Sequence, residues 1–180
     1  MVQFLIRKRG RYMSIPVEIE RKYVIAMPDM AELSGLCGYT VSEIDQTYLA
    51  SAEHVTHRVR KRVFGERVVY TETKKIRIDK MSAFEDEREL TEEEYCALLK
   101  LRKEGTVTLK KVRHTFDYSA QTFEVDIYPE WQKTAILETE LPSRETEVAF
   151  PDFIKVVAEV TGDKRYSNAS MSHEFPKELI

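Results

Sequence analysis

Charged residues spaced two positions apart, with apolar residues between them, are the feature that most restricts how this chain can fold. In segment 15–24, Glu18 and Glu20 alternate with Val17 and Ile19. Side chains of a β-strand change face at every residue, so the two carboxylates would lie about 7 Å apart on one face, with the apolar side chains on the other. A single segment of this kind is typical of a strand with one solvated face.

The same pattern recurs along the chain, and it is sorted by charge. Carboxylates share a strand face at Glu18 and Glu20, Glu87 and Glu89, and Glu138 and Glu140, with Asp126 as a single example. Cations do so at Arg58 and Arg60 and at Lys111 and Arg113, with Lys22 and Lys74 as single examples. A one-sided sheet would carry mixed charges on its strands. A closed barrel could turn these faces inward, where carboxylates would bind hard divalent cations and Arg and Lys would bind phosphate oxygens.

The periodicity predicts a mostly antiparallel sheet with few helices. The expected strands are residues 15–24, 43–50, 55–64, 67–76, 107–118, 121–128 and 135–141. Residues 84–90 alternate like a strand, although their many Glu residues would equally suit the start of a helix. Thr91 and Glu94 form a capping box that begins a helix, and an apolar stripe predicts another helix over 150–161. About eight strands without an alternating strand–helix rhythm indicate an α+β protein whose antiparallel sheet closes on itself.

The charge balance and the cysteines narrow the function classes. Charged residues make up 33% of the chain, yet the net charge is only −3. A general nucleic-acid-binding protein would carry a basic surplus, so we expect no nucleic-acid partner. No segment approaches 18 apolar residues, so we expect no membrane span. Cys37 and Cys96 fit no metal-binding spacing and are expected to be reduced thiols in a cytoplasmic protein.

An ordered series of motifs resembles a known family. The segment Glu18-Ile19-Glu20-Arg21-Lys22 resembles the ExExK signature of the CYTH superfamily, the triphosphate tunnel metalloenzymes. Further elements follow in the family's order: Gln46-Thr47-Tyr48, Arg58-Val59-Arg60, Thr73-Lys74, Glu87-Arg88-Glu89, Lys111-Val112-Arg113, Glu124-Val125-Asp126, Glu138-Thr139-Glu140 and the segment 160–166. ExExK alone is a weak signal in so charged a chain, but the ordered set over residues 15–170 is a strong one.

The resemblance implies a closed eight-stranded antiparallel β-barrel with flanking helices, whose central tunnel binds a triphosphate with Mg²⁺ or Mn²⁺. By position, the residues implied to bind metal are Glu18, Glu20, Glu87, Glu89, Asp126, Glu138 and Glu140. Those implied to grip the triphosphate are Lys22, Arg58, Arg60, Lys74, Lys111, Arg113 and Arg165. The implied catalytic residues are Lys111, Glu18 and Glu20, with a simple phosphate clamp as the alternative for Lys111. The implied parts are an extension (1–13), a CYTH-like tunnel domain (14–172) and a C-terminal tail (173–180).

One position departs from the family pattern. Family members often carry Arg two residues before the acidic pair of the fifth strand, and here that position is Glu85. If the strand register is right, Glu85 lies on the same face as Glu87 and Glu89. Three carboxylates on one face repel each other unless cations lie between them. Glu85 in place of Arg removes one phosphate ligand and adds a negative charge, so it bears on substrate affinity and on substrate identity.

The chemistry implied is attack of water on a terminal phosphoryl group, which needs positioning and charge neutralisation more than covalent help. We expect metal-dependent hydrolysis of inorganic tripolyphosphate or a similar small triphosphate, such as thiamine triphosphate. Two alternatives stay open: cyclisation of ATP to cyclic AMP and pyrophosphate, as in class IV adenylate cyclases, and binding of polyphosphate without turnover. The expected partner is the small-molecule triphosphate, and the sequence leaves a homodimer open.

Overall fold

Eight strands of 7 to 12 residues form the main body of the fold. The structure, a computed structural model, describes residues 4–8, 11–15 and 17–180. The strands are β3 (Val17–Ala26), β4 (Cys37–Tyr48), β5 (Val55–Phe64), β6 (Arg67–Arg77), β7 (Ser82–Leu90), β8 (Leu109–Tyr118), β9 (Gln121–Ile127) and β10 (Thr134–Glu140). They confirm the strands predicted from alternation, including residues 84–90, although β4 begins six residues earlier than expected.

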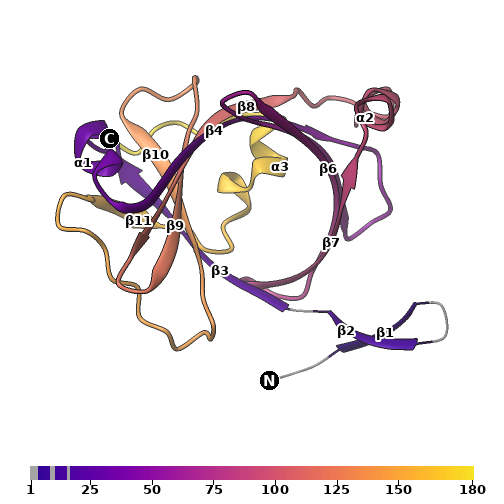
Figure 1. Cartoon of the computed structure of the whole chain (residues 1–180), viewed down its shortest axis with the longest axis horizontal. Helices are drawn as coiled ribbons and strands as arrows, with labels where there is room; N and C mark the ends of the chain where they lie inside the picture. The colour runs from indigo at the N-terminus through magenta and orange to yellow at the C-terminus, as the bar shows by residue number, and fades with distance from the viewer. Residues whose placement is uncertain (1–3, 9–10, 16) are drawn as a thin grey trace.

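One pairing closes the sheet. The strands pair antiparallel in the order β10-β9-β8-β4-β5-β6-β7-β3, and β10 also pairs with β3, where Glu138 lies opposite Lys22. The result is the predicted closed eight-stranded antiparallel barrel, seen as a ring in Figure 1. Strands β1 (Phe4–Lys8) and β2 (Arg11–Ile15) form a separate two-stranded hairpin beside it. Residues 1–3 and 9–10 of the predicted extension lie outside the described residues.

Short helices lie around and inside the ring. They are α1 (Met30–Ser34), α2 (Glu92–Leu99), the 3₁₀ helix η1 (Lys164–Tyr166) and α3 (Asn168–Met171). The predicted capping box begins α2: Glu94 N donates to Thr91 Oγ1 and Thr91 N donates to Glu94 Oε2. In Figure 1, α3 is seen within the ring. In the described part of the chain, no helix combines the length and apolar character needed to span a membrane.

Apolar side chains fill one part of the barrel interior. Val24, Tyr48, Leu109 and Ile136 from the strands are buried together with Met171 of α3. Most of these side chains lie on the inner faces of their strands. The same inner face bears charged side chains farther along the strand, as on β3, where Val24 follows Glu20 and Lys22. The interior is therefore divided between an apolar part, which α3 helps to fill, and a charged part.

The predicted helix over 150–161 is wrong. Residues 156–159 instead form β11 (Val156–Glu159), an extra strand that pairs antiparallel with β3 at Tyr23 to Ile25. On this side β3 pairs with β7 only through Val17 to Ile19, so its backbone groups beyond Ile19 need another partner. The β-branched valines of this segment suit that strand better than a helix.

Candidate functional site

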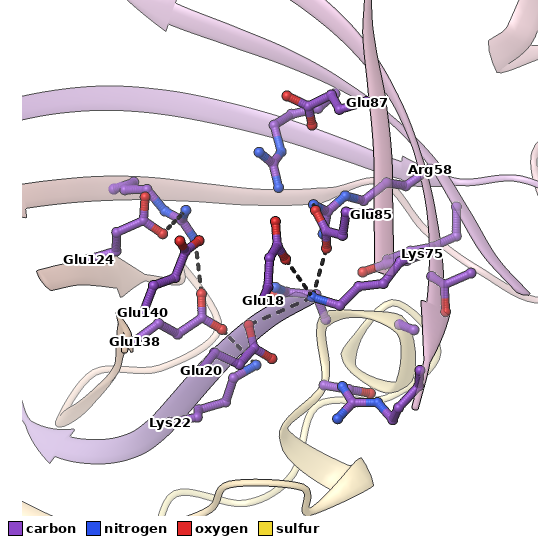
Figure 2. Close-up of a pocket in the computed structure, with 18 of the residues that line it drawn as sticks. Glu18, Glu20, Lys22, Arg58, Lys75, Glu85, Glu87, Glu124, Glu138 and Glu140 are labelled. Atoms are coloured by element: carbon purple, nitrogen blue, oxygen red, sulfur yellow. Dashed lines mark hydrogen bonds and ion pairs between the residues drawn. The ribbon is translucent and has the colours of Figure 1, made fainter. Parts of the chain in front are cut away.

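The charged part of the barrel interior encloses a cavity of about 330 Å³ (Figure 2). Seven carboxylates line it: Glu18, Glu20, Glu85, Glu87, Glu124, Glu138 and Glu140. Seven cations line it as well: Lys22, Arg58, Arg60, Arg62, Lys75, Arg77 and Arg113. The remaining lining residues are Tyr48, Thr56, Ser167, Asn168 and Ala169. A cavity with so many charges and a single aromatic ring suits a small, highly charged ligand.

The arginines of β5 form a row along one wall. Alternation places Arg58, Arg60 and Arg62 on the inner face, and the pairing with β6 and β4 fixes that face. Arg60 Nε and Nη2 donate to Gln46 Oε1 over 3.3 and 3.2 Å, and Arg62 Nε donates to Ser42 Oγ over 3.0 Å.

This row carries more positive charge than its neighbours neutralise. Within the described part of the chain, neither Arg60 nor Arg62 has a carboxylate within 4.0 Å, and the buried Nε of Arg58 donates to no acceptor. Burial is the main cause that lowers the pKa of Arg60 to about 10, and the positive charges of Arg58 and Arg113 lower it further. Guanidinium groups held in this way can bind an anion without first breaking an ion pair.

The carboxylates of β3 and β10 show the opposite imbalance. The pKa of Glu18 is raised to about 7, mainly by burial and secondly by the negative charge of Glu85. Burial and the neighbouring Glu124 and Glu20 also raise the pKa of Glu140. A raised carboxyl pKa means that the charged form lacks sufficient neutralisation. The cavity therefore has one region that favours anions and another that favours cations.

Lys75 and Arg58 neutralise the unusual Glu85. Lys75 Nζ lies 2.7 Å from Glu85 Oε1, and Arg58 Nη2 lies 3.5 Å from Glu85 Oε2 (Figure 2). Although burial opposes it, the positive charge of Arg58 and Lys75 lowers the pKa of Glu85. Glu85 does lie in the cavity beside Glu87, as the register predicted, but cations from β5 and β6 supply the neutralisation that the sequence pattern did not place there.

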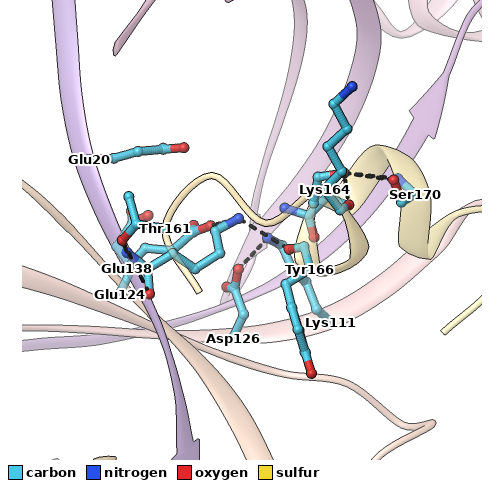
Figure 3. Close-up of polar contacts among 12 residues, drawn as sticks. Glu20, Lys111, Glu124, Asp126, Glu138, Thr161, Lys164, Tyr166 and Ser170 are labelled. Atoms are coloured by element: carbon cyan, nitrogen blue, oxygen red, sulfur yellow. Dashed lines mark hydrogen bonds and ion pairs between the residues drawn. The ribbon is translucent and has the colours of Figure 1, made fainter. Parts of the chain in front are cut away.

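A dense ion-pair network lies beside the cavity, on β8, β9 and β10 (Figure 3). Lys111 Nζ donates to Asp126 Oδ2, and both side chains are buried. Arg113 donates to Asp126 Oδ1 over 2.6 Å and Oδ2 over 2.7 Å, and to Glu138 Oε2 over 3.1 Å. Burial and the charge of Arg113 lower the pKa of Lys111 to about 8. Asp126 is thus fully engaged by two cations from β8.

The structure brings most of the sequence-predicted residues together, but not all. Those that line the cavity are Glu18, Glu20, Lys22, Arg58, Arg60, Glu87, Arg113, Glu138 and Glu140. Lys111 and Asp126 are next to them in the buried network and do not line the cavity. Lys74, Glu89 and Arg165 lie elsewhere.

Lys74 points away from the cavity because of contacts on the outside of the barrel. Tyr70, on the same strand face, packs against Tyr95 of α2 with ring centroids 4.8 Å apart. Glu72, also on that face, pairs with His57 over 2.7 Å. The Lys74 side chain is accordingly 55% exposed, whereas that of Lys75 is 17% exposed and lies inside. The cavity cations from β6 are therefore Lys75 and Arg77, and not the predicted Lys74.

Glu89 and Arg165 lie outside the cavity, Glu89 near the end of β7 and Arg165 in the short helix η1. Glu89 shares the face of Glu85 and Glu87, but it lies beyond the cavity near the end of β7, and it is exposed. Arg165 belongs to η1, where its guanidinium pairs with Asp163 over 2.7 Å and is 73% exposed. No periodicity extends into such a turn, so the orientation of this side chain could not be predicted from the strand pattern.

Four cavity charges escaped sequence analysis: Arg62, Lys75, Arg77 and Glu124. Each could have been found by continuing an alternation already recognised. Arg62 follows Arg58 and Arg60, Glu124 precedes Asp126 by two residues, and Lys75 and Arg77 follow Thr73 at the same spacing.

The donor set of the cavity fits a hard divalent cation. No group of three or more His, Cys, Asp or Glu among the described residues is arranged closely enough to hold a metal ion by itself. Carboxylate oxygens are nevertheless the ligands that Mg²⁺ and Mn²⁺ prefer. The under-neutralised Glu18 and Glu140 are where a divalent cation would relieve the most repulsion.

Solved structures share this architecture. No known family profile matches the sequence, and no curated protein matches it either. The structure titled hypothetical protein NE1496 is 25% identical over 88% of this chain and 99% of its own, with a TM-score of 0.54. The structure titled inorganic triphosphatase NE1496 is 24% identical over 89% and 97%, with a TM-score of 0.55. PH1819 from Pyrococcus horikoshii OT3 is 20% identical over 71% and 80%, with a TM-score of 0.52.

The barrel, its charged interior and these likenesses agree with the ordered motifs of the sequence. The chain shares the fold of these structures, which is the closed barrel that the resemblance to the CYTH superfamily implied.

Proposed function

We propose that this protein hydrolyses a small linear triphosphate, with inorganic tripolyphosphate as the preferred substrate, in the presence of Mg²⁺ or Mn²⁺. The observation that carries the proposal is the arginine row of β5. Arg60 and Arg62 are partly buried, and neither has a carboxylate within 4.0 Å in the described chain. Such charges are costly unless an anion neutralises them. NE1496, titled an inorganic triphosphatase, supports the same reading.

The cavity favours a substrate without a large organic group. Its lining includes one aromatic ring, Tyr48, and one aliphatic side chain, Ala169. A nucleobase or thiazole ring is normally held by apolar or aromatic surface. We therefore place tripolyphosphate ahead of thiamine triphosphate and ATP, and we find no observation that favours a cyclase.

The cations of the cavity divide into two roles. Among the described residues, Arg60, Arg62 and Arg77 have no carboxylate within 4.0 Å, and the contact of Arg58 with Glu85 is 3.5 Å long. These four arginines can hold phosphate oxygens and neutralise the charge that spreads over them as the terminal phosphoryl group is transferred. Arg113 and Lys22 are occupied by carboxylates, Lys22 lying 2.6 Å from Glu138. These two organise the acidic wall. Lys111, proposed as catalytic from the sequence, is better placed to fix Asp126 and Arg113 than to contact a phosphate.

The carboxylates would hold the divalent cation. Glu18, Glu20 and Glu140 are the proposed ligands. All three line the cavity, the pKa values of Glu18 and Glu140 are raised, and Glu20 lies opposite Glu140 in the β3–β10 pairing. When bound, a divalent cation supplies neutralisation of phosphate charge and orientation of the attacking water. The protein's part is to place the arginine row opposite these carboxylates, so that substrate oxygens can meet both.

A product assay tests the proposal. The protein is incubated with tripolyphosphate or ATP, with Mg²⁺ or Mn²⁺, and the products are identified by ³¹P NMR. We expect pyrophosphate and orthophosphate from tripolyphosphate, and a large loss of that activity in Arg60→Ala. The matched control is Lys61→Ala, the next residue on the opposite face of β5. Cyclic AMP from ATP, or triphosphate binding without turnover, would each contradict the proposal.

A further inference from the structure

Lys75 lies among the carboxylates that would hold the metal. Its Nζ is 3.5 Å from Glu18 Oε2, 3.7 Å from Glu20 Oε2 and 2.7 Å from Glu85 Oε1. Figure 2 shows the ammonium group reached by dashed lines from all three side chains. Lys75 enters from β6, whereas Glu18 and Glu20 are on β3 and Glu85 is on β7, so the four side chains converge from three strands.

A divalent cation and this ammonium group cannot both bind Glu18 and Glu20. Each would need to approach the same two carboxylates, and two positive charges a few ångströms apart repel each other. Cation binding therefore requires the ammonium group to move. Lys75 can do so because its charge is carried at the end of a flexible four-carbon stem.

Glu85 offers Lys75 a place to remain after it leaves the acidic pair. Its contact with Lys75, at 2.7 Å, is shorter than those of Glu18 and Glu20. With Glu85 as partner, Lys75 stays neutralised inside the barrel. Its other two N–H groups then become available to phosphate oxygens.

We propose that Lys75 is a positioning residue that competes with divalent cations for Glu18 and Glu20, and thereby keeps the metal affinity of the substrate-free protein low. A triphosphate that draws Lys75 toward its own oxygens would release the acidic pair and strengthen metal binding. By linkage, bound metal strengthens triphosphate binding by the same factor. This inference rests on the metal ligands named in the proposed function, but it does not require turnover.

The test measures Mn²⁺ binding alone, with no triphosphate present. Free Mn²⁺ is followed by EPR during titration of the wild type, Lys75→Met, Lys75→Arg and Lys74→Met. We expect Lys75→Met to bind Mn²⁺ at least about tenfold more tightly, since even 1.4 kcal/mol of relieved competition gives that factor. Lys75→Arg keeps the charge and should stay within about twofold of the wild type. Lys74→Met removes a neighbouring charge outside the barrel and should do the same.

Three outcomes would overturn the inference: an unchanged Mn²⁺ affinity in Lys75→Met, an equal tightening in Lys74→Met, or no Mn²⁺ binding by any of the proteins. If Lys75→Met fails to fold, Lys75→Gln replaces it and is compared with Lys75→Arg in the same way. The product assay is independent of these titrations. Absence of hydrolysis by the wild type would remove the proposed function and leave the Mn²⁺ comparison in force.

Discussion

Replacing Arg60 by Met should separate binding from stability, because this arginine forms no ion pair with any residue that the structure describes. The folded protein lowers its pKa from 12.5 to about 10, through burial and then through Arg58 and Arg113. This corresponds to an unfavourable free energy of about 3 kcal/mol for the charged form, which is present at all pH values below 10. Against it stands the loss of both hydrogen bonds to Gln46 Oε1, which costs about 1–3 kcal/mol if that acceptor stays unpaired.

The two contributions to stability therefore nearly cancel. We expect the free energy of unfolding of Arg60→Met to lie within about 2 kcal/mol of the wild type, which for a chain of this size is a change in Tm of less than about 8 °C. Affinity should behave differently. Loss of a charge-assisted contact worth about 1.5–3 kcal/mol weakens tripolyphosphate binding by roughly 10- to 150-fold.

Arg113→Met is the matched contrast inside the same barrel. Arg113 donates to Asp126, Glu124 and Glu138, so its removal leaves buried Asp126 and Glu138 with one cation each and Glu124 without this partner. That should cost roughly 3–5 kcal/mol of stability. Urea unfolding followed by Trp131 fluorescence gives the stabilities, and the KM for tripolyphosphate reports the affinity. The reasoning is refuted if Arg60→Met is the strongly destabilised variant while its KM is unchanged.

Three further predictions concern the buried ion pairs, the metal and pH. Asp126→Asn leaves Lys111 and Arg113 undercompensated and should lower the unfolding free energy by about 3–5 kcal/mol, whereas Asp45→Asn breaks an exposed pair and should cost less than about 1 kcal/mol. EDTA should abolish hydrolysis, and Mn²⁺ or Mg²⁺ should restore it better than Zn²⁺; full activity in EDTA would exclude the metal. Because the pKa of Glu18 is raised to about 7, the metal-free protein should lose stability as pH rises from about 4.5 to 7; thermal melts of Glu18→Gln should show a smaller loss.

Alternation predicted the inner wall well where one face of a strand was unmistakable. On β5, Arg58 and Arg60 alternate with His57, Val59 and Lys61, and the structure places the arginines inside. On β6 two lysines are adjacent, so either face offers a cation. Which face turns inward is decided by Tyr70, which packs on α2, and local sequence does not record that contact.

Two other features were decided by neighbours in space. Residues 156–159 became a strand because β3 had unpaired backbone groups at Tyr23 to Ile25, and β3 is more than a hundred residues away in the chain. Glu85 needs cations nearby to offset the acidic residues of its own strand, and the sequence alone did not place them. Lys75 lies opposite Glu85 in the β6–β7 pairing, and Arg58 reaches it from β5.

The strict alternation of the barrel wall also limits how such a chain can change in length. A single residue inserted within β5 would shift every later side chain of that strand to the opposite surface. Beyond the insertion, Val59 and Lys61 would replace Arg60 and Arg62 on the inner wall, although no residue had been substituted. Insertions and deletions should therefore be tolerated in turns, such as the one at Gly65 between β5 and β6. Within a strand, the number of residues before a given position decides whether its side chain lines the cavity or faces outward.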